Sequence, residues 1–521
     1  MPLIAAHELD TDCGSIQVYN AMDSMLTCEV LNELKTLLPS HNSPIELQGP
    51  KLIYDFERAL QAPAIEMNLR GWKIDPWARE DGIAKLRKRL ERLSDIIDCY
   101  VSAICDLRSP TKATNDHPKP KTLNPNSTSQ LATFFYDILQ IPPIIRKKEG
   151  KLTKPMEREI LEKLEGYFIA RPIIAAILSY RDNEGQLEVL ETEIDSDWRM
   201  RTSFNPAMTT TSRFSSSKSI TGTGRNFQNI EEELRYMFIA NKDKKLFGAD
   251  LEQAETRETG WLCWVLFGDS SYLDSAESGD PHTILAREIW ENDLDWNGDL
   301  KHDRKIADQL YYRQHSYREV AKRVRHGTEK FGGYLEIARQ IRVPNKLIKS
   351  AQERMFATYP CLNQFFTWVA GQLQREHYLI DAFGGRRDFF GRADSNDTIK
   401  EGIAFMSQAP TARRLNLGLW RMWKYMGPNS NHPVELIAQL HDAVYGQRLE
   451  FDTNEAKIIS EMQKHLDVPL SYRGRRFTVP SEAKVGWSWG NANQDHPDGL
   501  IKWTTSGDKR TRVNNNLELV A

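Results

Sequence analysis

Two aspartates in this sequence lie where a strand is expected to end, and such a pair could hold metal ions. Asp250 follows the apolar stretch LFGA and precedes Gln253 and Glu255, which are expected to begin a helix. Asp442 lies far downstream in VELIAQLHDAVYGQRLE, where apolar alternation on both sides of His441-Asp442 predicts two strands joined by a tight turn. Two hard carboxylate ligands can fix two Mg²⁺ ions roughly 4 Å apart, one activating a hydroxyl and one steadying a leaving pyrophosphate. We therefore interpret Asp250 and Asp442 as ligands of two Mg²⁺ ions, which Mn²⁺ could replace.

A basic stripe occupies the segment SYREVAKRVRHGTEKFGG. Arg318, Lys322 and His326 recur every four residues, so they share one face of a predicted helix over about 12 Å. Cations at this spacing can contact a nucleoside triphosphate from phosphate to sugar and offset the charge of departing pyrophosphate. By spacing alone a solvated basic face would be favoured, but the two metal carboxylates reverse that preference. His282, in the segment GDPHT, is a further candidate phosphate contact.

The composition limits the class of protein. At 521 residues and 60.0 kDa the chain is too long for one compact core, so several domains are expected. A formal net charge of -3 and a pI of about 6.5 give no global signature of a nucleic-acid binder. Basic residues nevertheless gather in RKKEGKLTK (146–154), around Arg386, and between Lys301 and His326. Beside the motifs above, these clusters favour contacts with phosphate.

Cysteine usage and apolar runs bear on location. The cysteines at 13, 28, 99, 105, 263 and 361 have neither metal-ligand spacing nor a pattern of paired bridges, which is typical of a reducing compartment. The N-terminal MPLIAAHELDTD lacks the regions of a signal peptide, and the longest apolar run, around WLCWVLF, is too short to cross a bilayer. We therefore expect a cytoplasmic protein without membrane partners.

Helical and strand-like segments follow one another in blocks. Apolar residues recur every three or four positions from 76 to about 106 and predict a long amphipathic helix. Helical periodicity returns in QLATFFYDIL and PMEREILEKL, on both sides of the basic loop IRKKEGKLTK, which predicts a helical arm with a charged tip. Residues 271–380 are mostly helical, whereas 434–490 read as strands with one helix. The polar segment after Asn491 lacks periodicity and is expected to be mobile.

Several of these segments resemble motifs of the DNA polymerase I family (family A) and occur in that family's order. DLEQAE is similar to the first palm motif and HDA to the last, while Arg318, Lys322, His326 and Gly327 match the RxxxKxxx(aromatic)G finger motif. TTTSRFSS with RNFQNI, GGRRDF and FMSQA resemble segments that contact primer and template. YDFERALQAPAIEMNLRGWKID, LNPNSTSQL and ILSYRD resemble the approach to the thumb, and AKVGWSWG also matches.

The resemblance implies an α+β fold in the shape of a right hand, with an antiparallel palm sheet, helical fingers and a helical thumb. The expected divisions are a remnant like the end of a 3'-5' exonuclease domain (1–45), the palm approach and thumb (46–200), the first palm part (201–270), the fingers (271–395), the second palm part (396–490) and a polar tail (491–521). YNAMDSMLTCEV resembles the last exonuclease motif through Tyr19 and Asp23, without room upstream for the other motifs. Intrinsic proofreading is therefore not expected.

The implied activity is template-directed extension of a DNA primer 3'-hydroxyl with deoxynucleoside triphosphates, releasing pyrophosphate. The implied partners are primer-template DNA and these nucleotides, with a separate exonuclease or processivity factor as a further partner. A compact member of this kind suggests a bacteriophage source and hence the host cytoplasm. The implied metal ligands are Asp250, Leu251 and Asp442, and Asp250, Asp442, Lys322 and Arg318 would be catalytic. The nucleotide contacts would be Arg318, Lys322, His326, His282, Glu255 and Gln253, with Glu255 excluding a ribose 2'-hydroxyl. The DNA contacts would be Arg213, Asn226, Gln228, Asn229, Arg386, Arg387, Lys400, Gln408 and His441.

Four features depart from the family pattern. His326 stands where Phe or Tyr is usual, so we predict altered discrimination against 3'-deoxy nucleotides. Ala443 replaces an auxiliary Glu after the palm aspartate, which should modify activity without abolishing it. KFG at 330–332 replaces Tyr-Gly with one extra residue, and Lys400 stands where Arg is typical.

Two other classes of protein share some of these features. A single-subunit RNA polymerase also has two palm aspartates and a basic finger helix, but Glu255 packed under the sugar would crowd a 2'-hydroxyl. A catalytically silent DNA-binding accessory protein would not need the metal pair together with Arg318 and Lys322. Both stand as alternatives to a DNA polymerase.

Overall fold

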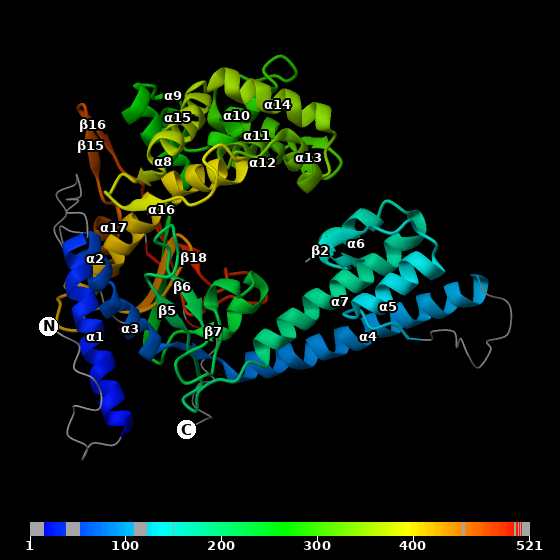
Figure 1. Cartoon of the computed structure of the whole chain (residues 1–521), viewed down its shortest axis with the longest axis horizontal. Helices are drawn as coiled ribbons and strands as arrows, with labels where there is room; N and C mark the ends of the chain where they lie inside the picture. The colour runs from blue at the N-terminus through cyan, green and yellow to red at the C-terminus, as the bar shows by residue number, and fades with distance from the viewer. Residues whose placement is uncertain are drawn as a thin grey trace.

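The computed structural model describes residues 15–37, 53–108, 122–148, 151–450 and 454–504, with 507, 508, 510 and 512. These residues form a region built on a central sheet, a helical body that lies at the top of Figure 1, and a long helical arm at its right. Of the expected exonuclease remnant at 1–45, only α1 (Ser15–Leu37) lies within the described residues.

The central sheet has five antiparallel strands in the order β13-β14-β8-β17-β18. The strands are β8 (Lys244–Leu251), β13 (Glu435–Leu440), β14 (Ala443–Leu449), β17 (Ser481–Gly486) and β18 (Ile501–Lys502). The apolar run before Asp250 is buried on both faces, which is why β8 takes the central place. The register sets Asp250 opposite Ala443 on one side and opposite Glu482 on the other. The antiparallel sheet predicted for this region is therefore confirmed.

Helices α8 (Ala254–Phe267), α16 (Asn396–Tyr425) and α17 (Glu455–Leu466) pack in this region. A buried ion pair joins two of them, because Arg414 of α16 donates from Nε and Nη2 to Glu258 Oε1 of α8 at 2.9 and 2.8 Å. The neighbouring elements are α2 (Ile53–Ala59), α3 (Gln61–Arg70), β5 (Ser203–Asn205), β6 (Ser215–Ser217), η4 (Phe227–Asn229), η5 (Glu232–Met237), β15 (Leu470–Tyr472) and β16 (Arg475–Phe477). One continuous apolar core spans the sheet and these helices.

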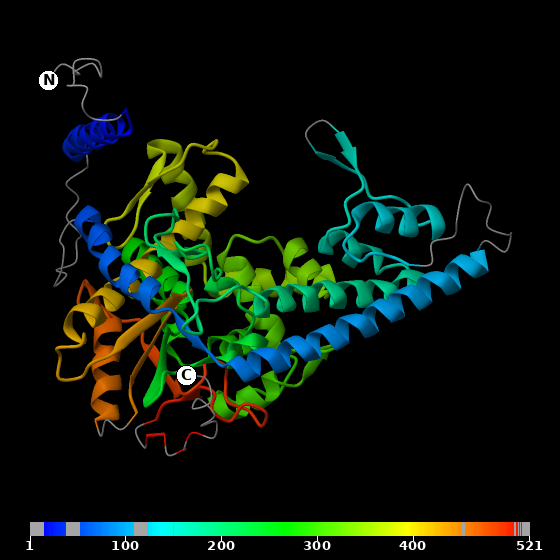
Figure 2. The ribbon, with the colours of Figure 1, turned by 90° about the horizontal axis from the view of Figure 1, so that it is seen from below.

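The arm consists of two long helices that pack side by side, α4 (Pro76–Arg108) and α7 (Arg171–Leu190) (Figures 1 and 2). Its outer part carries α5 (Thr128–Ala132), η2 (Thr133–Ile138), α6 (Arg158–Leu164) and η3 (Phe168–Ala170), over a separate apolar core. The long helix predicted from 76 to about 106 is confirmed. The basic segment expected as a loop is instead an antiparallel pair, β2 (Arg146–Lys148) and β3 (Lys151–Thr153), because Lys and Thr side chains are compatible with exposed strands.

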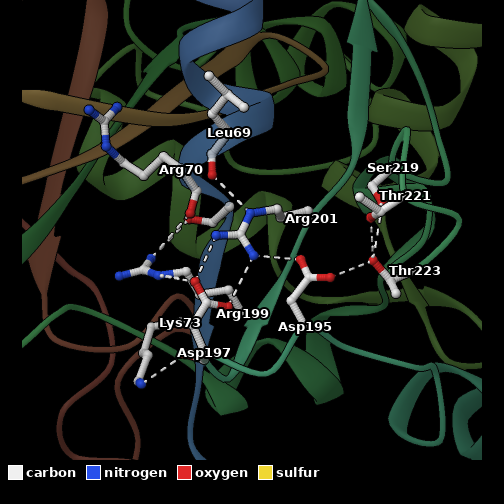
Figure 3. A network of polar contacts seen from close by, with 11 residues as sticks. Leu69, Arg70, Lys73, Asp195, Asp197, Arg199, Arg201, Ser219, Thr221 and Thr223 are labelled. Atoms are coloured by element: carbon white, nitrogen blue, oxygen red, sulfur yellow. Dashed lines mark hydrogen bonds and ion pairs between the residues drawn. The ribbon is translucent and has the colours of Figure 1, made fainter.

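The root of the arm is fixed to the sheet region by charge pairs. The small sheet β4-β1-β7, with β1 (Trp72–Ile74), β4 (Arg199–Met200) and β7 (Phe238–Ile239), lies there. In Figure 3 the guanidinium of Arg201 lies between Asp195, Asp197 and the carbonyl of Leu69. Asp195 also accepts from Thr223 Oγ1 at 2.8 Å, so the network extends to the loop after β6. These bonds tie α3, the end of the arm and that loop together.

The helical body comprises α9 (Ser271–Glu277), α10 (Pro281–Ile289), α11 (Leu300–Ala307), α12 (Tyr317–Glu329), α13 (Tyr334–Ile341), α14 (Asn345–Thr358) and α15 (Cys361–Glu376). Two short antiparallel pairs complete it, β9 (Leu310–Tyr312) with β10 (His315–Ser316) and β11 (Tyr378–Ile380) with β12 (Arg386–Asp388). The body has its own apolar core. The predicted helical character of 271–380 is confirmed.

The segment after Asn491 differs from its prediction. Ile501 pairs with Val485 as part of β18, and Arg510 donates to the carbonyl of Val485 at 3.2 Å. Lys245 of the central strand forms a buried ion pair with Asp508 at 2.9 Å. The strand pairing, the hydrogen bond and the ion pair hold these residues to the sheet, although no periodicity in the sequence reveals these three contacts. Among the described helices, none is long and apolar enough to cross a membrane.

Candidate active site

The two predicted metal ligands meet at neighbouring strand ends. Asp250 is the penultimate residue of β8, and Asp442 lies in the turn between β13 and β14. The backbone N–H of Leu251 donates to the carbonyl of Asp442 at 3.0 Å, which fixes the turn against the end of β8. His441 takes a left-handed conformation with φ 52°, as the tight turn requires. The strand-turn-strand prediction around His441-Asp442 is confirmed.

The electrostatics of the pair favour a bound cation. The Asp250 side chain reaches the surface, yet the surrounding protein raises its pKa to about 6, and the charge of Asp442 adds to this effect. Burial also raises the pKa of Asp442, against the opposing charge of Arg213. A carboxylate whose ionisation is disfavoured by burial and by a neighbouring carboxylate is stabilised by a nearby divalent cation. Within the described residues, no group of three or more His, Cys, Asp or Glu side chains gathers in metal-binding geometry.

Arg213 lies between Asp442 and Glu255. Its Nη2 is 3.1 Å from Asp442 Oδ1 and 2.6 Å from Glu255 Oε1. The backbone before it is held by α16, because Asn416 Nδ2 donates to the carbonyl of Ser212 at 2.9 Å. Lys330 Nζ lies 3.6 Å from the other oxygen of Glu255. The predicted DNA contact Arg213 therefore joins the predicted metal ligand Asp442 to Glu255, the predicted sugar gate that would exclude a ribose 2'-hydroxyl.

The residues between Asp250 and Glu255 turn the chain from strand into helix. Leu251 is buried at the end of β8 and its side chain is apolar, so only its backbone carbonyl could contact a metal. Gln253 was expected to lie in the helix, but it precedes α8 in a left-handed conformation with φ 51°. That conformation reverses the chain, so α8 begins at Ala254 and Glu255 lies in its first turn.

Helix α12 carries the basic stripe predicted to bind a triphosphate, a ladder formed by Arg318, Lys322 and His326. Ser316 caps it by accepting from the N–H of Glu319, so the helix begins just before Arg318. Lys322 is exposed, while Arg318 and His326 are half-buried. The Arg318 guanidinium is held by Asp280, with Nε and Nη2 each 3.1 Å from a carboxylate oxygen. The predicted helix is therefore present, and the ion pair with Asp280 fixes the Arg318 side chain before any ligand binds.

His282 lies beside the far end of this ladder. Its ring centroid is 5.3 Å from that of His326, in an edge-to-face arrangement. Burial, followed by the charge of nearby His326, lowers the pKa of His282 to about 3, so the ring is neutral at physiological pH. Its buried Nδ1 has no hydrogen-bond partner among the described residues. His282 can therefore donate or accept one hydrogen bond to a ligand.

The predicted DNA contacts divide into two groups. Gln228 and Asn229 lie in η4, which Asn226 caps by accepting from the N–H of Gln228, and Gln228 Nε2 donates to the carbonyl of Phe214, next to Arg213 in the chain, at 2.6 Å. Arg386, Arg387 and Lys400 instead pair with Asp388, Glu401 and Glu336, at 2.6, 2.5 and 3.5 Å. Gln408 is half-buried on α16 and His441 is exposed. The first group is connected to the aspartate pair through Arg213, whereas the ion pairs of the second group involve neither aspartate nor Arg213.

Sequence reasoning missed several residues of this site. Asp280 holds Arg318, and its place before Pro281 at the start of α10 was the available signal. Arg304 of α11 also donates to Asp280, at 2.8 Å, and nothing in the spacing indicated it. Glu482 lies opposite Asp250 on β17, in the segment just before the AKVGWSWG match. Its carboxylate pairs with Lys502 at the edge of the sheet.

An antiparallel sheet with paired aspartates at its strand ends, a basic helix opposite and a helical arm define the right-hand polymerase architecture. The sequence profile described as DNA polymerase family A matches residues 105–491, and the chain belongs to that family. It is 26% identical to the thermostable DNA polymerase I of Thermus filiformis over 85% of this chain and 49% of that one. It is 24% identical to DNA polymerase I of Treponema pallidum over 91% of this chain and 43% of that one. The chain thus spans about half the length of the curated relatives it matches.

A solved structure has the same fold. The POL domain of Pol1 from M. smegmatis, in complex with DNA primer-template and dNTP, superposes with a TM-score of 0.67 at 17% identity. The match covers 91% of this chain and 74% of that one. The α+β right-hand fold is therefore confirmed, with the central sheet as palm, the helical body as fingers and the arm as thumb. The residue boundaries expected for these parts stay predictions.

Proposed function

We propose that this chain is a template-directed DNA polymerase that extends a DNA primer 3'-hydroxyl with deoxynucleoside triphosphates and releases pyrophosphate. The observation that carries the proposal is the meeting of Asp250 and Asp442 at adjoining strand ends, in a chain of DNA polymerase family A. The neighbouring Glu255 favours this activity over a single-subunit RNA polymerase. An accessory protein would bind DNA without needing the aspartate pair.

Family A polymerases use divalent metal ions, and the donor chemistry here fits them. Asp250 and Asp442 offer hard carboxylate oxygens, and we propose that they hold two Mg²⁺ ions, which Mn²⁺ can replace, with Leu251 as a further ligand. Bound there, the ions would lower the pKa of the primer hydroxyl and neutralise charge on the departing pyrophosphate. Asp442 keeps its position through the Leu251 hydrogen bond to its carbonyl.

The nucleotide is proposed to lie along α12. Arg318, held by Asp280, and exposed Lys322 would bind its phosphates, and Lys322 could protonate the leaving group. His326 would lie against the sugar and base, and neutral His282 would donate one hydrogen bond to a phosphate. Glu255, at the start of α8, would crowd a 2'-hydroxyl, with Gln253 beside it.

The duplex is proposed to pass Arg213, η4 and α16. Arg213, Gln408 and His441 would contact the minor groove, where every base presents a similar acceptor, so pairing shape is tested without reading sequence. Asn226, Gln228, Asn229, Arg386, Arg387 and Lys400 would contribute further primer and template contacts. Contacts of this kind are mostly to phosphate and weaken as salt rises.

A labelled primer on a DNA template tests this proposal. With Mg²⁺, deoxynucleotides should be incorporated and ribonucleotides should not. Extension with ribonucleotides alone would favour the RNA polymerase alternative, and duplex binding without any extension would favour an accessory protein. We also propose that the chain lacks intrinsic proofreading; release of a mismatched 3'-terminal nucleotide by the purified protein would contradict this. Adding a separate exonuclease or processivity factor tests those proposed partners.

A further inference from the structure

Asp280 accepts hydrogen bonds from the guanidinium groups of Arg318 and Arg304, and only Arg318 is assigned to the nucleotide in the proposed function. Arg318 of α12 contacts both carboxylate oxygens at 3.1 Å. Arg304 of α11 donates from Nη1 to Asp280 Oδ2 at 2.8 Å. Asp280 also caps α10 by accepting from the backbone N and Oγ1 of Thr283 at 3.2 and 2.8 Å. Three helices of the fingers thus meet at one carboxylate, beside the proposed triphosphate site.

The carboxylate of Asp280 is more deeply buried than the two guanidinium groups that pair with it. The Asp280 side chain is 10% exposed, that of Arg318 23% and that of Arg304 45%. The carboxylate therefore lies beneath the two guanidinium groups, and Lys322 one turn further along α12 is exposed as well. Arg304, Arg318 and Lys322 therefore expose more positive charge to solvent here than Asp280 exposes negative charge. Fixed cations that face solvent over a buried anion form an anion-binding surface.

Both arginines are held in place before a ligand arrives. Burial would raise the pKa of Asp280, but hydrogen bonds from Arg318 and Thr283 hold it at about 2, so the carboxylate keeps its charge at neutral pH. Arg304 also donates from Nε to Asp308 at 2.7 Å, but that carboxylate is 50% exposed. An exposed pair of this kind contributes little, so a phosphate can replace it at small cost. Planar guanidinium donors that are already ordered lose less entropy when they bind phosphate.

We infer that Arg304 binds the terminal phosphates of a polyphosphate ligand beside Arg318 and Lys322, with Asp280 as the positioning residue for both arginines. This inference rests on the proposed function, in which Arg318 and Lys322 bind the triphosphate. The ligand class is the triphosphate of the incoming nucleotide, or pyrophosphate in the reverse reaction. Arg304 supplies positive charge where the phosphate charge exceeds what Arg318 and Lys322 balance.

Binding of inorganic tripolyphosphate to the full-length, DNA-free protein tests this without catalysis. Calorimetry should show about tenfold weaker binding for Arg304→Ala than for wild type, the loss expected for one charge-assisted contact. Lys305→Ala is the matched control, because Lys305 is exposed on the same helix and its substitution also removes one positive charge. It should bind within about twofold of wild type. Equal binding by the two variants would overturn the inference.

Steady-state kinetics distinguish direct phosphate binding by Arg304 from a purely structural role. Arg304→Ala should raise KM for the nucleotide, and for pyrophosphate in the reverse reaction, by about tenfold with kcat within about threefold. The KM values of Arg304→Lys should lie between those of wild type and Arg304→Ala, because lysine keeps the charge but lacks the planar guanidinium. This variant can replace Arg304→Ala if the alanine variant does not fold. A lower kcat at unchanged KM values would mean that Arg304 only supports the fold, against the inference.

The two proposals fail in different ways. If the wild type extends primers but Arg304→Ala binds tripolyphosphate normally, the role of Arg304 is wrong and the polymerase proposal stands. If the wild type does not extend but Arg304→Ala binds tripolyphosphate about tenfold more weakly, the polyphosphate site stands and the polymerase proposal fails.

Discussion

The guanidinium of Arg213 bridges Asp442 and Glu255, with Nη2 3.1 Å from Asp442 Oδ1 and 2.6 Å from Glu255 Oε1. One positive charge therefore stabilises a carboxylate assigned to the metal and a carboxylate assigned to the sugar. We therefore expect this arginine to compete with a divalent cation for Asp442 in the DNA-free protein. The proposed contact of Arg213 with the minor groove would draw it away from that carboxylate.

Removing this charge should strengthen metal binding by the DNA-free protein. We expect Arg213→Met to bind Mn²⁺ about three- to tenfold more tightly than wild type, because a nearby cation is lost and the side-chain volume is kept. Electron paramagnetic resonance of free Mn²⁺ measures this directly. Arg213→Lys, which keeps the charge, should resemble wild type. Unchanged or weaker Mn²⁺ binding by Arg213→Met would show that Arg213 does not compete with the metal.

Metal binding should depend on pH through Asp250. Its pKa is raised to about 6, so below pH 6 the protonated carboxyl predominates and the proton competes with the metal. Mn²⁺ affinity should therefore fall as the pH is lowered from 7.5 to 5, with the steepest change near 6. Asp250→Asn should bind weakly without that transition. An affinity that stays constant down to pH 5 would contradict the raised pKa.

Discrimination against ribonucleotides should depend on the volume of Glu255. Glu255→Ala opens space at the start of α8 and should raise ribonucleotide incorporation, relative to deoxynucleotide incorporation, at least about tenfold. Glu255→Gln keeps the volume and should retain most of the discrimination. Single-nucleotide incorporation with matched deoxy- and ribonucleotides measures the ratio. If both variants discriminate like wild type, Glu255 is not the sugar gate.

The palm helices should depend on the Glu258–Arg414 pair for stability. Both side chains are fully buried, so Arg414→Met leaves an uncompensated carboxylate and should lower the free energy of unfolding by about 3–5 kcal/mol. Urea unfolding measures the loss. Arg392→Met is the matched control, because Arg392 is 82% exposed in its pair with Asp394 and should change stability by less than about 1 kcal/mol. If Arg414→Met and Arg392→Met lowered the free energy of unfolding equally, burial would not explain the contribution of the Glu258–Arg414 pair.

Local patterns in the sequence predicted local structure well. Alternation around His441-Asp442 indicated the β13–β14 turn, and spacing by four placed Arg318 and Lys322 on one face of α12. These signals work because the period of a strand or helix is set by the backbone itself.

Contacts between distant segments could not be predicted in this way. Arg304 reaches Asp280 from α11, and Arg213 contacts Asp442 although 229 positions separate them in the sequence. Neither contact leaves a period in the sequence, because each depends on how helices pack. The same reason explains β18, whose two residues join the sheet through β17 without a strand pattern of their own.

The measurement that tests the central claim most directly compares wild type with Asp442→Asn in two assays, single-nucleotide primer extension with Mg²⁺ and equilibrium binding of the same primer-template. The exchange keeps the shape of the side chain and removes the charge that would hold the metal. We expect extension to fall at least about 10³-fold while the affinity for DNA stays within about threefold. Extension close to that of wild type would contradict the assignment of Asp442 to the metal and, with it, the proposed mechanism.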